Sequence, residues 1–255
     1  MQRRLTWIFS LLMLGVLAMG TLLWGQGEQG KPPRYTYVSQ WAVPRAQWGE
    51  MTKLGAVDRA IFDRFLADGT IGGYGDFQNL IHTEGEPTHG SWFTASSEGN
   101  ILKVLAALYA QPEATAPVLA ASKHWDHFLM SHDYNGVSGN FDGAYLSGAQ
   151  WDVKLGQTQA FRGLLKSRVL PVLDKLVADG TVVAYSVDTE YYHTRKPGIV
   201  SLVTIAPDAA AVDKVDQAFE GTFGKDPEIG PALRAMTHME NNRDFLLQIM
   251  HMVNK

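Results

Sequence analysis

The residues best suited to catalysis lie in the segment Lys-His-Trp-Asp-His, which contains His124 and Asp126. A carboxylate beside an imidazole fixes its tautomer and raises its basicity, so Asp126 could orient His124 as a general base. Trp125 could line an apolar pocket next to this pair, and His132 and Tyr134 would extend that pocket along the following strand. A purely structural interpretation is also open, in which His124 caps the preceding helix and Trp125 packs in the core.

An earlier segment could bind a metal ion. His82 and His89 stand at the two ends of a Gly/Pro/Glu loop, where a hairpin would place their Cβ atoms roughly 5 Å apart. With Glu84 or the nearby Glu86, they could form the two-histidine, one-carboxylate site that divalent metals use. Trp92 on the next strand would add an aromatic wall to a pocket. The alternative is a polar hairpin tip, in which His82 binds loop backbone.

Both segments belong to the first copy of an internal repeat. The tetrapeptide Ala-Asp-Gly-Thr that begins at Ala67 recurs 111 positions later, at Ala178. At this offset 12 of the 45 positions from 63 to 107 are identical, where average composition gives roughly three. Duplication is therefore the simplest explanation. Because the second copy has Val200 in place of His89 and lacks the Trp-Asp pair, we expect a functional pocket in the first copy.

Hydrophobic periodicity gives the same order of elements in both copies. In the first, an aromatic and β-branched strand covers 35–43, and a helix with apolar residues three and four apart ends at Asp68-Gly69. Two strands joined by the Gly/Pro/Glu loop follow, then a helix around Ile101 and a closing strand from Phe128. The order is βαββαβ, twice. In the second copy, Pro171 predicts a kink in the first helix.

This tandem pattern resembles the ferredoxin-like unit of the dimeric α/β-barrel superfamily, which includes antibiotic-biosynthesis monooxygenases, stress-responsive barrel proteins and haem-binding chlorite dismutase relatives. The resemblance implies an α+β fold with ferredoxin-like repeats at 35–137 and 143–255, whose sheets pair into an intramolecular pseudo-dimeric barrel behind an N-terminal apolar helix. It rests on element order and duplication, without a catalytic motif matched residue by residue. The chain also resembles exported proteins without an assigned activity.

Several functions are compatible with these features. One is an oxygenase-like enzyme with a pocket in the first repeat, in which His124 and Asp126 are catalytic and Trp92 and Trp125 form walls. The resemblance to chlorite dismutase relatives would permit a haem, although the sequence requires neither haem nor a divalent metal. A ligand carrier without turnover and a structural envelope protein are the other interpretations. We favour a small-molecule-binding protein. The histidines considered as axial haem ligands are His82, His89, His124 and His132.

The N-terminal segment predicts export. Arg3 and Arg4 precede an uncharged apolar stretch at 5–24, about long enough to span a bilayer. We interpret 1–25 as a signal peptide or membrane anchor and 26–34 as a flexible linker, so that the protein is periplasmic, secreted or anchored in the inner membrane. The chain has no cysteine, which excludes disulfides and thiolate nucleophiles. Its net charge of −4 without basic clusters argues against nucleic-acid binding.

Overall fold

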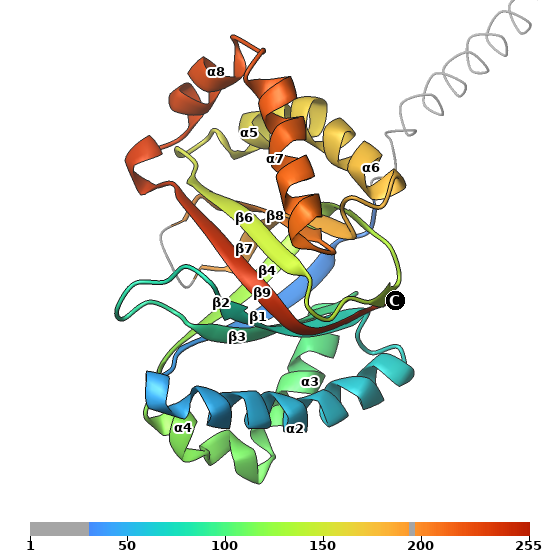
Figure 1. Cartoon of the computed structure of the whole chain (residues 1–255), viewed down its shortest axis with the longest axis vertical. Helices are drawn as coiled ribbons and strands as arrows, with labels where there is room; N and C mark the ends of the chain where they lie inside the picture. The colour runs from blue at the N-terminus through green and yellow to red at the C-terminus, as the bar shows by residue number, and fades with distance from the viewer. Residues whose placement is uncertain (1–30, 194–196) are drawn as a thin grey trace, which may run out of the picture. The chain divides into compact units, whose positions relative to one another are not determined.

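Strands from both repeats close into one antiparallel barrel (Figure 1). The structure is a computed structural model that describes residues 31–193 and 197–255, of which Pro32–Lys255 form one compact unit. Within these residues, eight long strands follow one another around the barrel in the order β2, β3, β1, β4, β7, β8, β6, β9, and β9 pairs back with β2. Their bounds are β1 (Arg34–Ala42), β2 (Gly73–Asn79), β3 (His89–Ala95), β4 (Lys123–Gly136), β6 (Tyr145–Asp152), β7 (Ala184–Tyr192), β8 (Ile199–Ala206) and β9 (Arg243–Asn254), and the short β5 (Gly139–Asn140) pairs with the end of β9.

The helices pack outside the barrel and fall into one group for each repeat (Figure 1). Helices of the first repeat cover β1 and β3, and helices of the second cover β7 and β8. The bounds are α2 (Trp48–Ala67), α3 (Glu98–Tyr109) and α4 (Pro117–Ala120) in the first repeat, and α5 (Thr158–Leu164), α6 (Leu170–Ala178), α7 (Ala209–Phe223) and α8 (Ile229–Met236) in the second, with short helical turns η1 (Arg45–Gln47), η2 (Pro112–Thr115), η3 (Leu165–Val169) and η4 (Met239–Asn241).

The predicted fold class is wrong. We expected two ferredoxin-like repeats that pair their sheets into a pseudo-dimeric α/β barrel. The strands instead form a continuous closed barrel, because β4 pairs with β7 and β2 pairs with β9 along most of their lengths. The order of elements agrees with the sequence, but periodicity does not reveal which strand edges join. The predicted N-terminal helix and residues 26–30 of the linker lie outside the described residues, while Arg34 already belongs to β1.

The repeated Asp-Gly turns end the first helix of each repeat, as predicted. Gly69 has φ +77° and its counterpart Gly180 has φ +80°, a left-handed conformation that glycine adopts without steric cost. In each turn the aspartate carboxylate accepts a hydrogen bond of 2.9 Å from the backbone N–H of the following threonine, Thr70 or Thr181. The identity of the two tetrapeptides therefore reflects a shared turn and does not mark a site.

The helix interruption expected near Pro171 is a turn of π-helix. It covers Leu165–Val169, between α5 and α6. A proline cannot donate a backbone hydrogen bond, and its ring crowds the preceding turn, so the helix widens before it. Pro171 itself stands in the first turn of α6, where a proline is tolerated.

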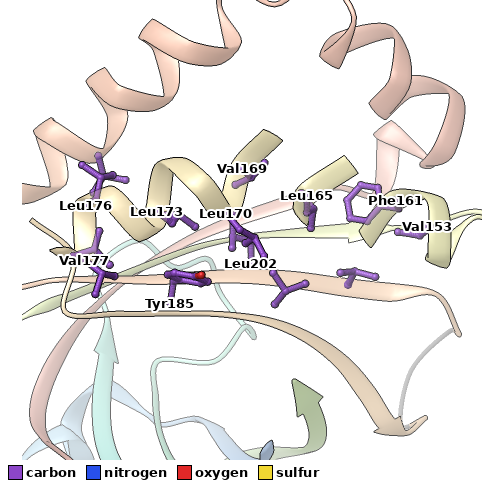
Figure 2. Close-up of a cluster of buried hydrophobic side chains, with 14 residues drawn as sticks. Val153, Phe161, Leu165, Val169, Leu170, Leu173, Leu176, Val177, Tyr185 and Leu202 are labelled. Atoms are coloured by element: carbon purple, nitrogen blue, oxygen red, sulfur yellow. The ribbon is translucent and has the colours of Figure 1, made fainter. Parts of the chain in front are cut away.

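The helices of the second repeat pack against the barrel more fully than those of the first. In the second repeat, fourteen buried side chains form a continuous core: those of α5, η3, α6, α7, β7 and β8, together with Val153 and Val182. In Figure 2, Leu165, Leu170 and Val177 lie between the helices and the strands. Phe161 and Leu173 in this core are fully buried. In the first repeat, Phe62, Phe65 and Phe93 form a similar but smaller core. A cavity remains beside it.

None of the described helices is long and apolar enough to cross a membrane.

Candidate functional site

The cavity beside the first-repeat core has a volume of about 300 Å³ and lies between the strands of the first repeat and helices α2 and α3. We call it the helix-side cavity. The side chains of β1 alternate between the two faces of the barrel wall, so Tyr37, Ser39 and Trp41 face this cavity. Leu54, Phe62, Leu105 and Leu108 supply apolar surface from the helices.

A hydrogen-bonded group on β1 and β4 forms the polar wall of this cavity. His124 Nε2 lies 2.9 Å from Asp126 Oδ1 and 2.8 Å from Ser39 Oγ, and the hydroxyl of Tyr37 donates to the same oxygen of Asp126. Trp41 stacks on the imidazole of His124, with ring centroids 3.6 Å apart, and its indole N–H donates to Ser39 Oγ. The structure thus brings the two predicted catalytic residues together and adds three residues from β1.

The electrostatics of this group favour an ionised aspartate. Burial alone would raise the pKa of Asp126, but hydrogen bonds from His124 and Tyr37 lower this pKa below its usual value. Burial and the hydrogen bond to Asp126 raise the pKa of Tyr37, which therefore keeps its proton. Because an ionised carboxylate can only accept, Asp126 holds a proton on His124 Nε2. In the neutral imidazole, Nδ1 then carries the basic lone pair.

Asp58 on α2 is a residue of this cavity that the sequence analysis missed. Burial, followed by repulsion from Glu113 and Asp76, raises the pKa of Asp58 to about 6. This aspartate can therefore change its protonation state near neutral pH, which suits a proton donor or acceptor. The helical spacing of Leu54, Asp58 and Phe62 would have placed all three on one face, but an aspartate on a long helix gives no other signal.

The corresponding region of the second repeat lacks this group. Ser147 stands at the position of Tyr37, and Ala149 at that of Ser39. His238 precedes the short turn η4 outside any strand, and its Nδ1 lies 3.8 Å from Glu240 Oε1. The space between helices and strands is filled by the core shown in Figure 2.

The expected register between His82 and His89 is wrong. His89 pairs with Gln78 across the hairpin, and β2 ends at Asn79, so His82 lies on the loop. The two histidines instead contact Trp48, with ring centroids 5.7 Å from His82 and 5.2 Å from His89. Burial and the nearby His82 lower the pKa of His89 to about 4, so His89 is neutral at physiological pH.

The other predicted pocket residues do not lie together in one cavity. Trp92 and His82 line a second cavity of about 650 Å³ in the lumen of the barrel, which we call the lumen cavity. Tyr134 lies under the guanidinium of Arg34, and its hydroxyl donates to the carbonyl of Pro32. Trp125 and His132 line neither of these cavities. The strand register shifts between Ser131 and Asp133, so the simple alternation expected along β4 fails there.

The described residues offer no ready metal site. Across 31–193 and 197–255, no three His, Asp or Glu side chains come close enough together to hold an ion. A haem iron would need an accessible imidazole nitrogen. Nε2 of His89 is buried, without hydrogen-bond partner or accessible surface, and Nε2 of His124 is bound to Asp126. These two histidines therefore do not fit an axial ligand as they stand, and we derive no step through a haem.

No protein-family model matches this chain, and no curated protein matches it. Solved structures with a similar fold exist at low identity. A monooxygenase-like protein from Lactobacillus acidophilus has a TM-score of 0.61 and 12% identity, over 88% of this chain and 97% of that one. A monooxygenase-like protein from Fusobacterium nucleatum has a TM-score of 0.60 and 11% identity, over 88% and 94%. A mutant chlorite dismutase from Candidatus Nitrospira defluvii has a TM-score of 0.52 and 9% identity, over 85% and 90%.

These neighbours are proteins of the dimeric α/β-barrel superfamily, as the resemblance in the sequence indicated. At such low identity the likeness concerns the fold alone. A further similar structure is described as an anthrone oxidase-like protein, with a TM-score of 0.51 and 11% identity over 88% of this chain and 94% of that one.

Proposed function

We propose that the helix-side cavity binds a small, mostly apolar molecule with an acidic proton, and that the protein is an oxygenase-like enzyme acting on it. The observation that carries this proposal is the group formed by His124, Asp126, Tyr37 and Ser39 on the wall of a cavity that the second repeat fills. Duplication followed by the loss of one pocket is the pattern expected when one copy does the chemistry.

In this proposal His124 is the general base. Asp126 keeps the proton on Nε2, so Nδ1 accepts a proton from the substrate. The resulting imidazolium is stabilised by the adjacent carboxylate, and stacking on Trp41 holds the ring in place. Asp58 can then exchange a proton with the substrate from the opposite, helical wall. The apolar side chains of α2 and α3 exclude water and hold the rest of the molecule.

The similar structures support an oxidation by molecular oxygen. The monooxygenase-like and anthrone oxidase-like descriptions both name reactions in which a small organic molecule is oxidised. A molecule that loses a proton to a base becomes more electron-rich and reacts more readily with oxygen. A general base in an apolar cavity is therefore the minimum that catalysis of such an oxidation requires.

Anthrone is a suitable probe, because it is planar, mostly apolar and carries acidic C–H protons. One anthrone and one O₂ give one anthraquinone and one water, so oxygen uptake measures the reaction. We expect the purified protein to accelerate this uptake and His124→Gln to reduce the acceleration about 100-fold, within the range of general-base contributions. His238→Gln, the matched change in the second repeat, should have no effect.

Two results would count against this function. If the wild-type protein neither binds anthrone nor accelerates its oxidation, the proposed substrate class is wrong. If His124→Gln and wild-type protein are equally active, the helix-side group is not the catalytic one. Binding without acceleration, lost in His124→Gln, would instead favour a carrier.

We also propose that the protein is exported, on the basis of Arg3, Arg4 and the apolar stretch at 5–24. Fractionation of cells that make the full chain with a C-terminal tag tests this, and mass spectrometry of the tagged product shows whether the N-terminal segment is removed. Recovery of the intact chain in the cytosol would contradict export.

A further inference from the structure

The lumen cavity lies on the other face of the barrel wall from the helix-side cavity, and the two linings share Tyr74 and Phe77. It is lined by residues from all eight long strands within the described part of the chain. On β1, Thr36, Val38 and Gln40 face the lumen, whereas Tyr37 and Ser39 face the helices. Nothing in the proposed chemistry at His124 uses this larger space.

The lumen contains a carboxylate that is only partly satisfied. The side chain of Glu190 on β7 is 4% exposed. Its Oε1 lies 3.6 Å from His127 Nδ1, and His127 Nε2 lies 3.2 Å from Gln40 Oε1. Oε2 of Glu190 is buried and has no hydrogen-bond partner among the residues that the structure describes. A buried carboxylate oxygen without a donor is unfavourable, so this position calls for a donor from outside the chain.

The neighbouring acid of the lumen needs no such donor. Asp188, also on β7, accepts hydrogen bonds from the hydroxyls of Ser131 and Ser186. Burial raises the pKa of Asp188, and the positive charge of Arg34 opposes this rise. Arg34 therefore compensates Asp188, whereas Oε2 of Glu190 is left without a donor in the described part of the chain.

The rest of the lumen suits an organic molecule with one polar end. Gln150 supplies an amide group and Ser201 a hydroxyl group to the wall of the cavity, and Gln150 Nε2 donates a hydrogen bond to Ser201 Oγ. Trp92, Phe77 and Phe245 provide aromatic surface in the same cavity. Aromatic faces attract cations, and their edges and faces also accommodate alkyl chains. The volume of about 650 Å³ lies within the range of small-molecule sites.

We propose that the barrel lumen is a second ligand site, which binds a small organic ammonium ion whose N–H groups donate to Glu190. The ammonium group supplies both the missing donor and the positive charge, and the attached hydrocarbon lies against Trp92 and Phe245. This site is independent of the proposed function, because it uses none of the polar residues around His124 that carry that function.

Isothermal titration calorimetry of the purified full chain with three six-carbon probes tests the proposal. Hexylamine is protonated at neutral pH, hexanol is neutral, and hexanoate is anionic, so the three differ only at the head group. We expect hexylamine to bind with a stoichiometry near one and at least tenfold more tightly than hexanol, and hexanoate not to bind.

The informative variant is Glu190→Gln, which keeps the size of the side chain and removes its charge. It should weaken hexylamine binding at least tenfold and leave hexanol binding unchanged, a selective effect that misfolding would not produce. His124→Gln is the matched control in the other cavity and should leave hexylamine binding intact.

Several results would overturn the proposal. Equal affinity for hexylamine and hexanol would show that the lumen selects no charge. Absence of hexylamine binding at millimolar concentration would show that water alone satisfies Glu190. Loss of binding in His124→Gln but not in Glu190→Gln would place the amine in the helix-side cavity.

Discussion

At the scale of single residues, position in the fold decides which titratable groups can do chemistry. His124, Asp126 and Asp58 share one cavity but come from β4 and α2, and their environments separate their protonation states. Hydrogen bonds keep Asp126 ionised, whereas burial among other acids raises the pKa of Asp58 to about 6. Carboxyl groups whose pKa values are pushed apart in this way are typical of acid–base sites.

The raised pKa of Asp58 has a consequence for stability. The folded protein holds a proton on Asp58 up to about pH 6, whereas the unfolded chain releases it near pH 3.9. Between these values the folded state binds more protons, so this residue makes stability fall as pH rises. We therefore expect Asp58→Asn to increase the free energy of unfolding at pH 7.5 more than at pH 4.

Urea unfolding at the two pH values measures this difference. Glu50→Gln, an exposed change on the same helix, serves as the control and should show no such dependence. An equal effect of Asp58→Asn at both pH values would mean that folding does not change the pKa of Asp58.

At the scale of elements, the close packing of β2 against its neighbours limits which residues of the second repeat could replace their counterparts in the first. Gly75 corresponds to Ser186 in the second repeat, yet a Cβ at Gly75 would lie 2.4 Å from Trp92 Cη2 and 2.8 Å from the carbonyl oxygen of His251. The glycine is therefore required by neighbours that the second repeat lacks.

The change Gly75→Ser should lower the free energy of unfolding by about 1–3 kcal/mol, the usual cost of overpacking. Gly72→Ser is a suitable control, since a Cβ there would make only an ordinary contact at 3.6 Å with Thr94. Thermal unfolding followed by circular dichroism compares the two. An unchanged midpoint in Gly75→Ser would show that Trp92 moves aside freely.

Element order could be predicted from the sequence, but the pairing of elements could not. Repetition and periodicity identified the strands, the helices and the Asp68-Gly69 turn, and the proline itself indicated the interruption near Pro171, because these features depend on local propensity. The β4–β7 and β2–β9 ladders join residues far apart in the chain, and no local pattern encodes them. The predicted pairing of His82 with His89 failed because the sequence does not show where β2 ends. The strand ends at Asn79, and His89 pairs with Gln78.

The part of the candidate site that lies on a single strand could be predicted from the sequence, because it depends on local alternation. His124 and Asp126 stand two residues apart on one strand, so alternation places them on the same face. Tyr37, Ser39 and Trp41 come from β1, about 85 residues earlier, and meet them only through strand pairing. Trp125 lies between His124 and Asp126 and was assigned to the pocket because it is aromatic. Adjacent residues, however, face opposite sides of a strand.

At the scale of the whole molecule, closure of the barrel couples the two repeats. The core of the second repeat contains Leu173, which is fully buried (Figure 2). Replacing this leucine with alanine should cost about 2–5 kcal/mol through lost contacts and a residual cavity. Because the strands form one continuous ladder, we expect amide protection to fall in β3 of the first repeat as well as in β8 of the second.

Hydrogen exchange with mass spectrometry resolves the two strands. Leu155→Ala is the control, since this leucine is 99% exposed, and it should change neither. If Leu173→Ala reduced protection in the second repeat alone, the repeats would unfold as independent units despite the shared barrel.

The central claim is that the first-repeat cavity beside His124 is the site that binds a small molecule. Histidine-selective ¹⁵N NMR during an anthrone titration tests this claim most directly. We predict that neutral His124 carries its proton on Nε2, as the hydrogen bond to Asp126 requires, and that anthrone shifts the His124 signals while those of His238 stay fixed. The Nδ1–H tautomer in the free protein, or anthrone-induced shifts at His238 without shifts at His124, would contradict the account.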